Sequence, residues 1–218
     1  MTFTFNLITE HWIPCIRADG ERIELSLRET LAQAHTLREI RGDTPLETAA
    51  LYRLLLAVLH RVFGPKNATE WRKLWQRCTQ GFDMAALDVY LQQWQHKFDL
   101  FDATQPFMQA RDPRVSDKSL NSLVIHMAGG NNGTLFDHHL DSFDIVLSSP
   151  QAARALLVSQ AFGIGGLSGL PEKFTDAPCA KGILFFAQGQ SLIETLVLNM
   201  VAVTGETPIP NEDDDCPV

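Results

Sequence analysis

Apolar residues at helical spacing dominate the first half of the chain and predict a helical lobe. The run 46–63 is almost continuously apolar, and it follows Thr44 and Pro45, a capping hydroxyl and a proline suited to the first helical turn. Apolar residues that cover more than one stripe of a helix indicate that the helix is buried on several sides. Similar caps and spacing predict further helices over 26–34, 69–78, 83–98, 151–162 and 191–203.

Short strand patterns accompany these helices. Residues 3–8, 12–17 and 22–25 have strand character, and the turn signal Ala18-Asp19-Gly20 predicts that they form a small antiparallel meander. Residues 35–42 favour a loop or a strand, and the apolar run 181–188 favours a buried strand. The expected fold class is therefore α+β, a mainly helical lobe with a small antiparallel β meander and long irregular loops. One domain is expected over 1–203, followed by an acidic tail or linker over 204–218.

Large apolar side chains outside these runs are expected to join the core. Trp71, Trp75 and Trp94 form a stripe across two of the predicted helices, which is more typical of a core than of a platform for stacking bases. In the irregular stretch 99–117, Phe107 and Met108 are expected to pin a loop to the core.

Composition restricts the function. The 218 residues are 45% hydrophobic, enough for one good core, and they carry a net charge of −8 with a pI near 5.3. A protein that holds bare DNA alone usually has a basic surplus, so any nucleic-acid contact is expected to be local or shared with partners. No segment is apolar enough to span a bilayer, which favours a cytoplasmic protein. The cysteines lack paired CxxC spacing and are expected to be reduced and packed: Cys15, Cys78, Cys179 and Cys216.

Four glycines within seven residues follow the helix predicted over 151–162. They are Gly163, Gly165, Gly166 and Gly169, and glycine permits positive φ and close approach of the backbone to a ligand. Such a loop exposes amides that can hold an anion or meet a nucleic-acid groove. A helix C-cap followed by an ordinary surface turn explains the same residues. The loop lacks the Gly-Lys-Ser/Thr ending of a P-loop, which excludes that nucleotide motif.

A second irregular stretch, 128–139, adds Asn and His to glycine. Asp137, His138 and His139 could bind a metal, and a metal-dependent phosphoesterase is the alternative function. The other histidines have no spacing that would complete such a site, so ordinary hydrogen bonding by a polar loop is favoured. No catalytic residue and no metal site is therefore assigned.

Several motifs, taken in order, resemble one family. They are Phe5-Asn6-Leu7-Ile8 with Trp12-Ile13-Pro14, then QPFMQ from Gln105, GGNNGTLF from Gly129, FGIGGLSGL from Phe162 and LVLNM from Leu196. In this order the chain resembles the large subunit of type I-E CRISPR Cascade complexes, the CasA family. The resemblance covers nearly the whole chain and corresponds to the family's N-terminal domain. Family members run to about twice this length, beyond what one domain usually holds, so residues 204–218 are expected to lead into a C-terminal region absent here.

The resemblance implies a subunit without catalysis or cofactor in the prokaryotic cytoplasm. It implies contact with the 5′ end of the CRISPR RNA, recognition of a protospacer-adjacent motif in duplex DNA, and help in starting the R-loop. The implied partners are the guide RNA, the duplex target, the backbone, small and 5′-handle-binding subunits, and a nuclease-helicase or fused nuclease, with no membrane. The implied DNA contacts are Gly163, Gly165, Gly166 and Lys173. The implied nucleic-acid loop holds Asn131, Asn132, Thr134 and Phe136.

Overall fold

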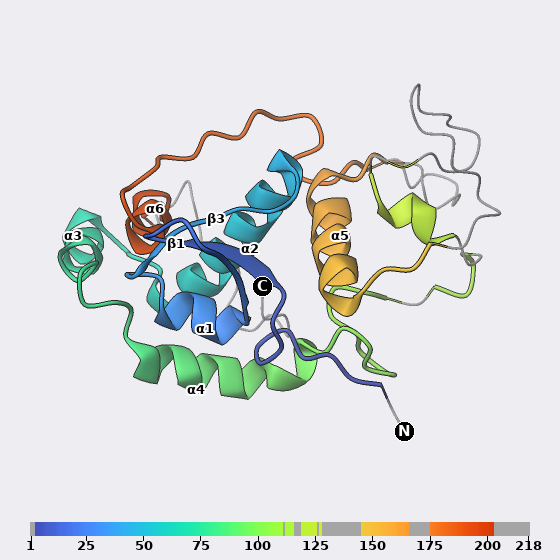
Figure 1. The fold of residues 1–218 in the computed structure, drawn as a ribbon, viewed down its shortest axis with the longest axis horizontal. Coiled ribbons are helices and arrows are strands. Elements are labelled where there is room, and N and C mark those ends of the chain that lie inside the picture. The colour runs from blue at the N-terminus through green and yellow to red at the C-terminus, as the bar shows by residue number, and fades with distance from the viewer. Residues whose placement is uncertain are drawn as a thin grey trace. The chain divides into compact units, whose positions relative to one another are not determined.

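A computed structural model describes residues 3–110, 112–115, 119–125, 127, 145–165 and 175–202 (Figure 1). The chain divides into two compact units. The first consists of Met1–Phe107 together with Phe185–Val218, and the second is Met108–Leu184. The boundary expected near residue 203 lies outside the described residues.

A three-stranded antiparallel sheet lies in the first unit. The strands are β1 (Ile13–Arg17), β2 (Arg22–Leu25) and β3 (Leu37–Ile40), in the order β2-β1-β3. Gly20, with φ of 92°, makes the turn between β1 and β2, while helix α1 (Leu27–Ala32) connects β2 to β3. Together with the helices, this sheet confirms the expected α+β fold.

Residues 3–8 do not form the predicted strand. Asn6 instead folds the chain into a turn, because its side-chain oxygen accepts the Ile8 amide at 3.1 Å and its carbonyl accepts the Glu10 amide at 2.8 Å. A single bridge from Asn6 to Asp99 is the β pairing of this segment. The third strand, β3, lies within residues 35–42, the stretch that was predicted to be a loop or a strand.

Side-chain caps fix the starts of the helices in the first unit. Helix α2 (Pro45–Phe63) begins after Thr44, whose hydroxyl accepts the Glu47 amide at 3.1 Å. Its apolar residues are buried on more than one side, as predicted: Ala50, Leu51, Leu54, Leu55, Val58 and Leu59. The other elements are α3 (Ala68–Gln76), α4 (Met84–Trp94), the 3-10 turn η1 (Gln95–Lys97) and α6 (Leu192–Leu198).

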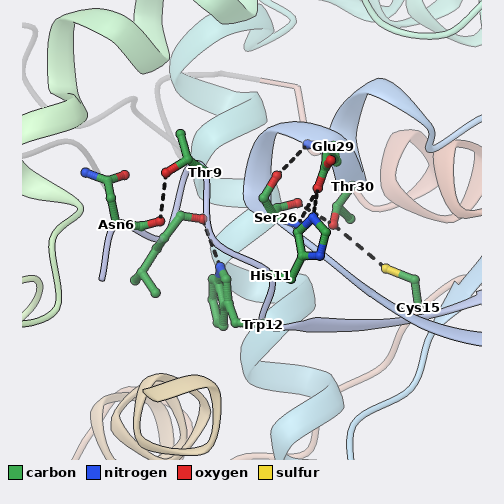
Figure 2. A network of polar contacts seen from close by, with 9 residues as sticks. Asn6, Thr9, His11, Trp12, Cys15, Ser26, Glu29 and Thr30 are labelled. Atoms are coloured by element: carbon green, nitrogen blue, oxygen red, sulfur yellow. Dashed lines mark hydrogen bonds and ion pairs between the residues drawn. The ribbon is translucent and has the colours of Figure 1, made fainter. Parts of the chain in front are cut away.

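A polar network around Trp12 joins the N-terminal turn to the sheet and to α1 (Figure 2). The Trp12 indole N–H donates to the Leu7 carbonyl at 2.8 Å, and Trp12 is completely buried. Ser26 and Glu29 form the predicted capping box at the start of α1. The same Glu29 carboxylate lies 2.9 Å from His11, so this end of the helix is tied to the turn.

Two expectations about burial were wrong. Residues 181–188 have no regular structure, and Ile183 and Phe185 are 81% and 87% exposed instead of buried in a strand. The segment is held by Asn199, whose side chain accepts from the Ala187 amide and donates to the Ala187 and Thr195 carbonyls at 2.7 and 2.6 Å. These bonds replace a strand ladder.

The tryptophan stripe is not core either. Helix α3 has no buried residue, and Trp75 is 36% exposed.

Helix α6 ends at Leu198 instead of near residue 203. Its capping box is shifted: the Ser191 hydroxyl accepts the Glu194 amide, but the Glu194 carboxylate accepts the Gln190 amide.

Of the described cysteines, Cys15 and Cys78 are buried as expected, whereas Cys179 is half-buried. Burial raises the pKa of Cys15 to about 12 and that of Cys78 to about 11, which disfavours the reactive thiolate at both. Among the described residues, no helix combines the length and apolar content that crossing a bilayer requires.

We predict that Trp12→Phe lowers the free energy of unfolding by about 1–3 kcal/mol, because it removes the buried donor to the Leu7 carbonyl. Urea denaturation followed by circular dichroism measures the change. Trp75→Phe is the matched control, since that indole is partly exposed and should cost much less. Equal losses in the two variants would contradict the role given to Trp12.

Candidate nucleic-acid interface

The second unit presents the glycine turn at the end of helix α5 (Ser149–Phe162). Ser148 and Gln151 form a capping box: the Gln151 side chain accepts the Ser148 amide at 2.9 Å, and the Ser148 hydroxyl accepts the Gln151 amide at 3.4 Å. The helix begins two residues before the predicted start because Ser148 is the cap. It ends at the predicted residue, so the position of Gly163 is set by a well-defined helix.

Position 163 requires glycine because a side chain would not fit there, and not because of its backbone dihedral angles. Its φ is −58°, which any residue adopts, and its amide donates to the Ser159 carbonyl at 2.8 Å. A Cβ atom built on Gly163 would lie 2.5 Å from that carbonyl oxygen. The interpretation of this glycine as a helix C-cap therefore accounts for its presence.

The chain returns to the end of α5 after the glycine-rich stretch. The Ala177 amide donates to the Gly163 carbonyl at 2.8 Å, and the Cys179 amide donates to the Ala161 carbonyl at 2.9 Å. Between these contacts the Gly165 amide donates to the Asp176 carboxylate at 2.7 Å. The two ends of the glycine-rich stretch are thus held together at one point.

The Asp176 carboxylate contacts both the Gly165 amide and Lys181 where the two ends of the glycine-rich stretch meet. The hydrogen bond from the Gly165 amide, followed by the contact with Lys181, lowers the pKa of the Asp176 carboxyl below its ordinary value of 3.8. Lys181 forms an ion pair with Asp176, but its side chain is 82% exposed, so water and salt screen the pair. Lys181 is therefore partly engaged with a carboxylate.

The segment before η2 (Leu120–Leu123) also contacts α5. The Gln160 side-chain amide donates to the Met108 carbonyl at 3.0 Å, where Met108 adopts a positive φ of 51°. Phe107, in the first unit, is buried and stacks on Phe98 at 5.3 Å, as expected. Met108 is only half-buried, so Phe107 anchors the loop.

The structure brings together only part of the expected site. Gly163 and Gly165 lie beside Asp176, and both glycine amides already donate to acceptors within the chain. These two N–H groups are therefore not free to bind DNA in this conformation. The other expected contacts lie outside the described residues: Asn131, Asn132, Thr134, Phe136, Gly166 and Lys173.

Sequence reasoning missed Asp176 completely. It is the one acid in the stretch 175–182, with no motif around it, and its partner Gly165 is 11 residues away. The alternative metal site, Asp137 with His138 and His139, also lies outside the described residues. Among the residues that are described, no group of three or more His, Cys, Asp or Glu could hold a metal ion.

Comparison with known proteins decides the family. The family described as CRISPR-associated protein Cse1 matches residues 6–218. The chain belongs to the Cse1 family, also called CasA. A curated relative, the CasA/Cse1 protein of Thermus thermophilus, is 41% identical over 214 residues. This Cse1 chain corresponds to the family's N-terminal domain, as the resemblance implied.

Solved structures agree with this assignment. A crystal structure of Thermus thermophilus CasA matches with a TM-score of 0.78 and 37% identity, over 95% of this chain and 41% of that one. A chain of a CRISPR RNA-guided surveillance complex matches with a TM-score of 0.77 and 26% identity, over 90% of this chain and 43% of that one. The curated Thermus relative is covered over 41% of its length by 94% of this chain.

We predict that Gly163→Ala lowers the free energy of unfolding by about 1–3 kcal/mol, because the new Cβ meets the Ser159 carbonyl and the end of α5 must shift. Gly182→Ala is the matched control, since a Cβ there has open space around it. Urea denaturation of both variants checks the difference. A Gly163→Ala protein as stable as Gly182→Ala would show that the end of α5 adapts freely.

The Asp176 contact should also depend on pH. Its carboxyl has a lowered pKa, so it stabilises the fold above the ordinary value of 3.8, and this contribution is lost as pH falls through the lowered pKa. We predict that the Gly165 amide resonance shifts in acid with a midpoint below 3.8. Asp176→Asn should abolish that transition. A midpoint at or above the ordinary value would contradict the hydrogen bond.

Proposed function

We propose that this Cse1 chain serves in an RNA-guided CRISPR surveillance complex as the part that recognises a protospacer-adjacent motif in duplex DNA. In the same complex it contacts the 5′ end of the CRISPR RNA and helps to start the R-loop. The observation that carries the proposal is the family match over residues 6–218, joined to a fold shared with a chain of an RNA-guided complex.

The charge of the chain supports a role within an assembly. A net charge of −8 opposes binding to bare DNA, which depends largely on releasing counterions from phosphates. Backbone, small and 5′-handle-binding subunits and the guide RNA would supply most of the affinity. This chain then needs to read only a few base pairs, because the guide reads the rest by pairing.

The hydrogen bond between the Gly165 amide and Asp176 supports a DNA-contacting turn whose two ends are held in place. With the ends of the stretch 165–176 joined at 2.7 Å, the backbone between them starts and finishes at one place on α5. In the proposal, Gly166 presents side-chain-free backbone to the minor groove, while Gly163 and Gly165 shape the turn that carries it. Minor-groove donors and acceptors are degenerate, so such contacts accept several motifs and reject a clashing exocyclic amine.

The remaining expected residues keep the roles that the resemblance gives them. Lys173 contacts phosphate next to the turn. Asn131, Asn132 and Thr134 bond phosphates or bases from the second irregular stretch, and Phe136 stacks on a base. In this proposal the chain itself is not catalytic, and cleavage belongs to a nuclease-helicase or fused nuclease.

The test is Gly166→Asp in the assembled complex with its guide RNA. A carboxylate on the turn should repel phosphate and block close approach of the DNA. We therefore predict that the affinity for a duplex carrying the motif falls by about tenfold or more. Electrophoretic mobility shifts with and without the motif measure the loss. Gly182→Ala, at a glycine with open space around it, is the control.

Assembly must be measured on the same samples, by co-purification of the other subunits and guide RNA. The proposal expects intact assembly and lost motif-dependent binding in Gly166→Asp. Motif-dependent binding equal to the wild type would contradict it.

A further inference from the structure

Helix α3 differs from the other helices of the first unit because it has an open, basic surface. Between residues 66 and 77 the sequence has Lys66, Arg72, Lys73 and Arg77 against the single acid Glu70, in a chain whose overall charge is −8. All four cationic residues are exposed, and α3 buries none of its residues. At about 100° per residue, Lys73 and Arg77 share one side of the helix, and Arg72 lies between that side and Trp75. We call Lys66, Arg72, Lys73, Trp75 and Arg77 the α3 surface.

These four cations have no carboxylate to neutralise them within the described residues. Some exposed arginines elsewhere in the unit are paired, for example Arg28 with Asp88 at 2.7 Å and Arg22 with Asp43 at 2.7 Å. On α3, Glu70 accepts the backbone amide of Lys66 at 2.8 Å instead of pairing with a side chain. Lys73 and the C-cap residue Arg77 are four residues apart, so their like charges are neighbours and repel each other.

A pair of tryptophans lies on the same helix. The Trp71 and Trp75 rings stack with centroids 5.8 Å apart and planes 9° from parallel. Trp71 is fixed, because its indole N–H donates to the Val197 carbonyl of α6 at 2.9 Å, which places α3 beside α6 (Figure 1). Trp75 is 36% exposed, and within the described part of the chain its N–H has no acceptor. Arg72 is its neighbour one helical turn earlier.

We propose that the α3 surface binds a single strand of nucleic acid. Its cations contact phosphates and Trp75 offers its ring to a base, the combination by which proteins hold single strands without reading sequence. An acidic protein segment would account for the cations, but it would not account for the exposed Trp75 ring stacked on Trp71. The inference goes beyond the function proposed above, because it requires neither the glycine turn nor a motif in the duplex.

The test compares two charge-matched double variants of the full chain. Lys73→Gln with Arg77→Gln alters the α3 surface, and Arg38→Gln with Arg53→Gln removes two exposed cations elsewhere. Binding of labelled oligothymidine and oligouridine is measured by fluorescence anisotropy over a salt series. We predict about tenfold weaker binding and a salt slope smaller by about 1.4 for the α3 variant, and wild-type behaviour for the control.

A second readout follows the ring itself. Binding of the oligonucleotide should quench tryptophan fluorescence, and Trp75→Phe should remove most of that quenching while retaining part of the affinity. Because the substituted side chains are exposed, unfolding midpoints should remain unchanged.

Several results would overturn the proposal. Equal losses in both double variants would show a general charge effect, and no loss in either would show that the surface is not used. Tighter binding of duplex than of single strands, or equal binding of polyglutamate, would assign it another ligand. The two proposals can fail separately: Gly166→Asp should leave oligonucleotide binding intact, and the α3 variant should retain motif discrimination.

Discussion

The carbonyl of Leu7 is the contact on which the first unit depends. It accepts the Trp12 indole N–H at 2.8 Å and the Leu27 amide at 3.1 Å, while the Leu7 amide donates to Phe98 at 2.9 Å. Leu7, Trp12 and Leu27 are completely buried, so losing these bonds would leave polar groups unpaired in the core. The N-terminal turn, the start of the sheet, α1 and the turn that follows α4 are all positioned through this one residue.

Local chemistry explains which parts of the fold could be predicted from the sequence. Helix starts at Ser26, Thr44 and Asp83 follow from side chains that bond amides two or three residues ahead, which a sequence displays directly. The error at residues 3–8 has a local cause as well, because an asparagine turn interrupts an apparent strand. Residues 181–188 are visibly apolar in the sequence, but composition alone does not determine whether a segment is buried by other parts of the chain.

The candidate site was predictable only in part. Four close glycines signalled an unusual turn, and one of them proved to be a helix end that leaves no room for a side chain. The partner of the turn, Asp176, could not be found, because an isolated acid in a loop gives no periodic or spacing signal. The α3 tryptophans were assigned to the core on spacing alone. Their exposure depends on which neighbours pack against α3, and that information is tertiary.

The side chain of Asn199 gives this fold a chemical weak point. One amide group acts as both donor and acceptor toward the backbone of Ala187, as a neighbouring strand would, and also donates to Thr195. Deamidation would replace the NH₂ group by a carboxylate oxygen facing two carbonyl oxygens, turning two attractions into repulsions. Ageing of a single residue would then release the segment that leads into α6, without any break in the chain.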